Sequence, residues 1–135
     1  MKELTISATT ENIETVTNFV NKQLEAVNCP LRTQTQISIA IDELFGNIAH
    51  YAYRPAVGSA TVRVEVAQSP LTVIITFIDS GIPYDPLTNA DPDITLSAEE
   101  RPIGGLGIYM VKKTMDELSY AYENGQNILT IKKRI

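Results

Sequence analysis

The sequence predicts an α+β fold in which three helices cover one face of a mostly antiparallel sheet of about five strands. Three observations predict it. Apolar residues recur at helical spacing in two long segments, they alternate or run together in short segments typical of strands, and Asn124-Gly125 is a strong hairpin signal. Strands joined by tight turns pair antiparallel, which leaves one face of the sheet for the helices to cover.

The N-terminal part is predicted to hold a strand and two helices. A short strand is expected at residues 5–8, and a helix follows at about residues 11–28, where apolar residues repeat every three or four positions. Pro30 interrupts the pattern, and a longer helix is expected at about residues 32–53.

The C-terminal part is predicted to supply most of the sheet. Residues 62–66 alternate between apolar and polar, and residues 71–79 are apolar on both faces, as expected for a central strand paired with the one before it. A third helix is expected to begin in the glycine-rich run 104–107. Strands at residues 118–123 and 126–133 form the last hairpin.

The composition indicates one globular domain spanning residues 1–135, with 44% hydrophobic and 20% charged residues. A net charge of −5 argues against nucleic acid as the main partner. The single cysteine, Cys29, excludes an intramolecular disulfide and a cysteine-rich zinc site, and the single histidine, His50, argues against a metal site with several imidazoles. Apolar runs are too short to span a bilayer, so we expect a soluble, cytoplasmic protein.

Polar residues on the second predicted helix form the first candidate site. Glu43, Asn47 and His50 lie at positions i, i+4 and i+7, and therefore share one face. A carboxylate beside an amide oxygen suits a general base next to Mg²⁺, which prefers oxygen ligands, and the imidazole suits a phosphate contact. The same residues also fit an ordinary solvated helix face, so both interpretations remain open.

Two glycine-containing strings form the other candidates. Asp79, at the end of the central strand, can accept a hydrogen bond from an exocyclic amine such as that of adenine, and Gly81 permits close approach of a ring. The run 104–107 opens a helix whose free N–H groups suit a phosphate. An ordinary turn and an ordinary helix entry explain the same strings. Tyr84 and Tyr120 are expected to be core or sheet-face aromatics.

The order of these strings resembles the GHKL (Bergerat) ATP-binding superfamily. Its three boxes correspond to Glu43-Leu44-Phe45-Gly46-Asn47, Asp79-Ser80-Gly81 and Gly105-Leu106-Gly107. Within the superfamily, the chain is similar to the anti-sigma factor serine/threonine kinases and their stand-alone relatives over essentially residues 4–133. The resemblance implies a two-layer α/β sandwich of the Bergerat type.

The resemblance also implies that the chain binds ATP with Mg²⁺. Glu43 would be the general base and Asn47 the Mg²⁺ ligand, while Asp79 would bind the adenine amine with support from Thr130 through water. Arg101 would approach the γ-phosphate from a lid formed by residues 80–103. The residues expected to bind the nucleotide are Asn47, His50, Asp79, Gly81, Arg101, Gly105, Leu106, Gly107 and Thr130.

The activity implied by the resemblance is phosphorylation of a small STAS-type anti-sigma antagonist by a homodimeric kinase, with a sigma factor as a further partner. The main alternative is a non-catalytic switch of the same fold, whose affinity for a regulator depends on the bound nucleotide. A third hypothesis is the ATPase domain of a sensor histidine kinase, although no helix with a phospho-accepting histidine precedes it in this sequence.

Overall fold

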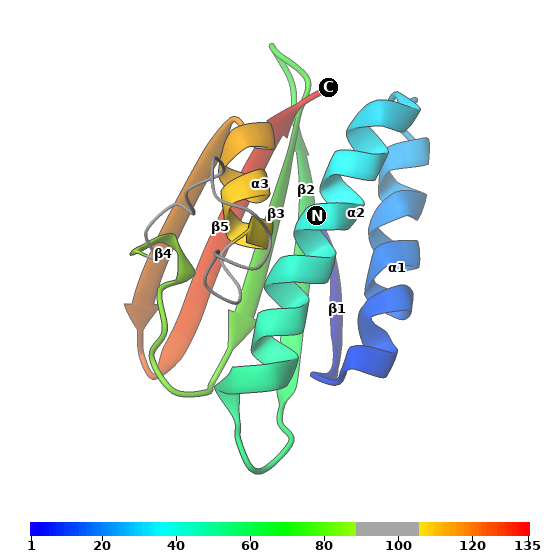
Figure 1. Cartoon of the computed structure of the whole chain (residues 1–135). Helices are drawn as coiled ribbons and strands as arrows, with labels where there is room; N and C mark the ends of the chain where they lie inside the picture. The colour runs from blue at the N-terminus through cyan, green and yellow to red at the C-terminus, as the bar shows by residue number, and fades with distance from the viewer. Residues whose placement is uncertain (89–105) are drawn as a thin grey trace.

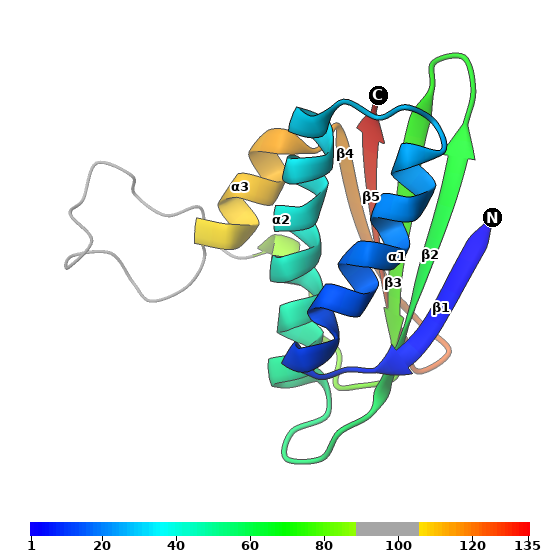
Figure 2. The same cartoon turned by 90° about the vertical axis from the view of Figure 1, so that its right-hand side faces the viewer.

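The computed structural model describes residues 1–88 and 106–135. Within these residues, one antiparallel sheet has the strand order β1-β2-β3-β5-β4, and three α-helices lie on one of its faces (Figure 1). The strands are β1 (Lys2–Ser7), β2 (Ser59–Ala67), β3 (Thr72–Asp79), β4 (Glu117–Glu123) and β5 (Gln126–Arg134), and the helices are α1 (Ile13–Glu25), α2 (Leu31–Asn47) and α3 (Leu106–Thr114). Figure 2 shows the helical and sheet layers from the side. The predicted α+β class is confirmed.

The middle strand β3 carries the core of the sheet. Its residues Val73, Ile75 and Phe77 are each 1% exposed and face the helices, and the same alternation brings Asp79 to that face at the end of the strand. The register pairs Asp79 with Asn127 of β5, so these two polar residues lie side by side.

Helices α1 and α2 join the core through apolar faces at helical spacing. Val16, Val20 and Leu24 of α1 are fully buried, as are Ile37 and Ile41 of α2. Burying each such side chain stabilises the fold by roughly 1.5–3 kcal/mol before conformational entropy is counted. The apolar repeat that predicted these helices is therefore also what attaches them to the sheet.

The second helix differs from the prediction at its C-terminal end. The α-helix ends at Asn47, and Ile48–Ala52 form one wider, π-type turn. In such a turn the backbone hydrogen bonds join residues i and i+5. This spacing changes the direction of the side chains that follow. The last predicted hairpin is confirmed, because Asn124 and Gly125 have φ of 52° and 75°, as a type I′ turn requires.

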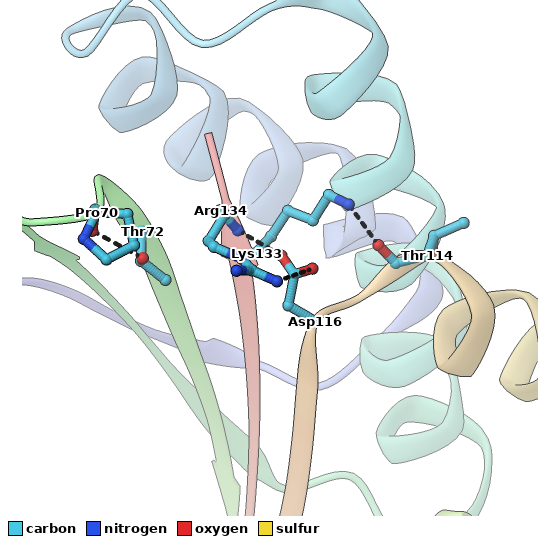
Figure 3. A network of polar contacts seen from close by, with 6 residues as sticks. All are labelled: Pro70, Thr72, Thr114, Asp116, Lys133 and Arg134. Carbon is cyan, nitrogen blue, oxygen red and sulfur yellow. Dashed lines mark hydrogen bonds and ion pairs between the residues drawn. The ribbon is translucent and has the colours of Figure 1, made fainter.

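The C-terminal end of α3 is tied to the end of β5. Lys133 donates from Nζ to the backbone oxygen of Thr114 at 2.7 Å, and the backbone N–H of Arg134 donates to Asp116 Oδ2 at 2.6 Å (Figure 3). The latter hydrogen bond, helped by the charges of Lys133 and Arg134, lowers the pKa of Asp116. In the described part of the chain, no helix has the length and apolar character needed to cross a membrane.

Candidate nucleotide-binding site

A pocket with about 440 Å³ of empty space, part of it open to solvent, lies between the end of α2, the paired ends of β3 and β5, and the loop after β3. Its place, at the paired ends of two strands beneath a helix end, is typical of a small-molecule site. It is mainly apolar, with a few polar side chains at defined places. The lining residues are Leu44, Asn47, Ile48, Tyr51, Ala52, Phe77, Asp79, Ile82, Tyr84, Pro86, Tyr120, Asn127 and Leu129.

Asp79 brings a buried carboxylate to this pocket. The residue is 6% exposed, and its Oδ1 accepts hydrogen bonds from the Gly81 N–H at 2.9 Å and from Asn127 Nδ2 at 3.0 Å. Among the described residues, both hydrogen bonds to this carboxylate end on Oδ1. Oδ2 is therefore the oxygen left to a ligand, and a carboxylate can only accept from an amine.

Gly81 lets the loop after β3 pack directly on the end of the preceding helical turn. A Cβ at this position would lie 2.6 Å from both the carbonyl carbon and the Cβ of Ala52. The neighbouring Ile82 N–H donates to the Ala52 oxygen at 2.9 Å. Since the obstacle is backbone, only glycine fits, and the loop is held over one wall of the pocket.

Glu43 and Asn47 lie one turn apart on α2, as predicted, so that the Asn47 side chain acts on the Glu43 carboxylate. Burial raises the pKa of Glu43, the polar side chain of Asn47 lowers it, and the nearby charge of Asp42 raises it, with a net upward shift. Asn47 also lines the pocket, and its amide oxygen is an acceptor suited to a cation or a donor. A half-buried carboxylate with a raised pKa is suited to take up a proton.

The N-terminus of α3 lies directly against Glu43. A Cβ at Gly107 would be 3.0 Å from Glu43 Cγ and would overlap the carboxylate group itself. Gly107 and Leu106 are the first two residues of α3, whose first-turn N–H groups have no acceptor within the helix. These N–H groups and the helix dipole create a site suited to an anion such as a phosphate, next to the predicted base.

Mg²⁺ fits the chemistry of this end of the site. In the described ranges, no cluster of three or more His, Cys, Asp or Glu side chains is arranged to hold a metal ion. Magnesium is, however, commonly bound through one or two protein oxygens together with phosphate oxygens and water. Asn47 Oδ1, beside the Glu43 carboxylate, is the protein oxygen that would hold it.

Two predicted positions need correction. Thr130 was expected near the adenine amine, but β5 turns Asn127, Leu129 and Ile131 toward the helices, so Thr130 lies on the opposite face of the sheet. His50 was expected to join Glu43 and Asn47, but the wider turn at Ile48–Ala52 leaves it exposed and outside the pocket lining.

Two further predicted positions, Arg101 and Gly105, lie outside the described residues.

The pocket also includes residues that the sequence analysis did not assign to it. Asn127 is 6% exposed and contacts Asp79, and Tyr51 and Tyr84 line the pocket with ring centroids 6.4 Å apart. Tyr120 lines it as well, rather than serving only as a core aromatic. Helical spacing from Asn47 was a signal for Tyr51, and period-two alternation with Leu129 and Ile131 was a signal for Asn127.

Two protein kinases are among the known proteins to which this chain is similar. The serine/threonine-protein kinase BtrW of Bordetella bronchiseptica is 28% identical over 100 residues, covering 74% of this chain and 70% of BtrW. The serine-protein kinase RsbW of Bacillus cereus is 29% identical over 101 residues, covering 71% of this chain and 61% of RsbW. The matched segment thus spans less than two thirds of the RsbW chain.

A solved structure supports the fold. The crystal structure of the RsbU and RsbW domains of Rv1364c from Mycobacterium tuberculosis aligns with a TM-score of 0.65 and 18% identity, over 99% of this chain and 32% of that one. The family described as Histidine kinase-like ATPase domain matches residues 6–133. This match includes α2, the end of β3 and the part of β5 that lines the pocket. The chain therefore belongs to the histidine kinase-like ATPase domain family.

Proposed function

We propose that this chain is an ATP-dependent serine/threonine protein kinase that phosphorylates a small STAS-type anti-sigma antagonist and regulates transcription by partner switching. The observation that carries the proposal is the packing of the Glu43 carboxylate against Gly107 at the N-terminus of α3. It puts a base with a raised pKa beside a helix N-terminus suited to an anion, close to the pocket that Asn47 lines. The names of the related kinases support the same activity.

In this proposal the pocket binds the adenine. Asp79 Oδ2 accepts a hydrogen bond from the exocyclic amine, while the apolar lining, including Phe77 and Leu129, excludes water from the base. Adenine presents a donor at that position whereas guanine presents an acceptor, so a carboxylate there favours adenine.

The phosphates lie toward α3. The N–H groups at the start of α3 bind phosphate oxygens. Asn47 would hold Mg²⁺, which would neutralise part of the phosphate charge. Glu43 accepts the proton of the target serine or threonine hydroxyl. The hydroxyl oxygen then bonds to the γ-phosphorus, the bond between that phosphorus and the bridging oxygen breaks, and ADP leaves.

The partners and surroundings follow from the same proposal. The substrate is the STAS-type antagonist, a sigma factor is a second binding partner, and the kinase acts as a homodimer in the cytoplasm. Arg101 and Gly105 remain predicted contacts to the phosphates. These assignments rest on the resemblance and on the names of the related kinases.

Transfer of labelled γ-phosphate from ATP to purified STAS-type antagonists tests the proposal. Glu43→Gln should reduce transfer by about 10²–10⁴-fold, the usual contribution of a general base, while nucleotide affinity is retained. Glu14→Gln, at an exposed position on α1, is the matched control and should transfer at the wild-type rate.

A loss smaller than about tenfold in Glu43→Gln would contradict the assignment of the base. ATP binding with no transfer to any antagonist would favour the non-catalytic partner switch.

A further inference from the structure

Asn127 is a buried amide whose hydrogen-bonding capacity is fully used inside the protein. Its Nδ2 donates to Asp79 Oδ1 at 3.0 Å and to the Ile82 oxygen at 2.9 Å. Its Oδ1 accepts from the Tyr84 N–H at 3.1 Å and from the Tyr120 hydroxyl. A primary amide has two donor hydrogens and two acceptor lone pairs, so no capacity remains for a ligand.

These four bonds join three parts of the pocket. They connect the carboxylate of Asp79, the backbone of the loop at Ile82 and Tyr84, and the hydroxyl of Tyr120 on β4. The pairing of β3 with β5 makes this possible, because Asp79 and Asn127 are register partners. Asn127 therefore influences the shape of the pocket through residues that line it.

The most direct effect is on the orientation of the Asp79 carboxylate. Asn127 Nδ2 and the Gly81 N–H both bind Oδ1, which fixes the rotation of the carboxyl group. A fixed carboxylate presents the same oxygen to every ligand. Without the Asn127 donor, the hydrogen bond to the Asp79 carboxylate that remains among the described residues is the one from the backbone N–H of Gly81.

We propose that Asn127 is a positioning residue for base recognition, which orients Asp79 and thereby sets the preference for a purine with an amine at C6, as in adenine. This inference rests on the proposed nucleotide-binding function. It assigns Asn127 no contact with the nucleotide. It places the specificity for the amine in the pair Asp79–Asn127 rather than in Asp79 alone.

The test compares ATP with purine riboside 5′-triphosphate, which lacks only the exocyclic amine. The wild-type protein should prefer ATP by about tenfold to a hundredfold, as expected for a hydrogen bond to a charged group. In Asn127→Ala this ratio should fall toward one, because affinity for ATP drops more than affinity for the analogue. Gln126→Ala, which removes an exposed amide from the adjacent residue of β5, is the matched control and should keep the wild-type ratio.

A purely structural role for Asn127 would give a different result. If Asn127→Ala weakens both nucleotides equally and the ratio is unchanged, the proposal is overturned. If the alanine variant does not fold, the ratio of affinities for ATP and the analogue is measured instead in Asn127→Ser, which keeps one hydroxyl donor. In an Asp79→Asn background, removal of Asn127 should change the ratio no further, since its effect passes through Asp79.

A measurement on the unmodified protein is independent of these variants. The two side-chain amide protons of Asn127 should be protected from hydrogen exchange with and without ATP, because both are donated inside the protein. Exchange at the rate of a solvated amide would overturn the proposal. If the wild-type protein binds neither triphosphate, the proposed function is contradicted, and this inference with it.

Discussion

Replacing Gly107 by alanine tests whether the contact between α3 and Glu43 is essential for catalysis. Ordinary contacts of a Cβ are 3.4 Å or longer, whereas a Cβ here would be 3.0 Å from Glu43 Cγ and closer still to the carboxylate. The carboxylate must therefore move by about 1 Å, and a misplacement of that size costs about 100-fold in rate. This factor corresponds to about 2.7 kcal/mol in the activation free energy.

The fold should tolerate the change. Overpacking costs about 1–3 kcal/mol, but the obstacle is the end of a flexible side chain, and alanine gains about 0.5–1 kcal/mol over glycine in a helix. We expect single-turnover phosphate transfer to fall about 100-fold while the melting temperature changes by only a few degrees. Gly46→Ala on α2 is the matched control, because the nearest atom to its Cβ would be Ile13 Cδ1 at 3.9 Å, and it should keep wild-type transfer. Wild-type transfer by Gly107→Ala would refute the assigned geometry.

Two further predictions concern pH. Phosphate transfer requires deprotonated Glu43, and burial raises the pKa of this carboxylate above its ordinary 4.5. The transfer rate should therefore fall with decreasing pH at a midpoint above 4.5. A midpoint at or below 4.5 would argue against Glu43 as the base. The pKa of Asp116 is lowered by its hydrogen bond from Arg134, so its contribution to stability is present above the ordinary pKa of 3.8 and is lost as the pH falls through the lowered value. Asp116→Asn should therefore melt below the wild type at pH 7, and the difference should narrow as the pH falls below about 3.8; a constant difference would contradict this.

Local spacing was enough to predict the parts of the site that lie within single elements. Glu43 and Asn47 are one helical turn apart, so their proximity follows from α2 alone. Asp79 and Gly81 are close in sequence, and the strand pattern before them indicates that the carboxylate comes at a strand end. The fold class followed from the same short-range periods.

The remaining features depend on contacts between distant segments or on local irregularity. Asn127 meets Asp79 across 48 residues, through a strand pairing that the sequence pattern did not specify in register. Thr130 is three positions further along β5, and an odd separation on a strand places it on the other face. The π-type turn at Ile48–Ala52 displaced His50, and an α-helical repeat cannot reveal such a turn.

The central claim is that Asp79 recognises the adenine of ATP in this pocket. Titration calorimetry of ATP and ADP with and without Mg²⁺, on the wild type, Asp79→Asn and Thr130→Val, tests it most directly. We predict that Mg²⁺ strengthens ATP binding by the wild type and that Asp79→Asn loses about tenfold to a hundredfold in ATP affinity. Thr130→Val should keep the wild-type affinity, because its side chain lies on the opposite face of the sheet. Equal affinity of Asp79→Asn and the wild type, or no binding by the folded wild type, would contradict it.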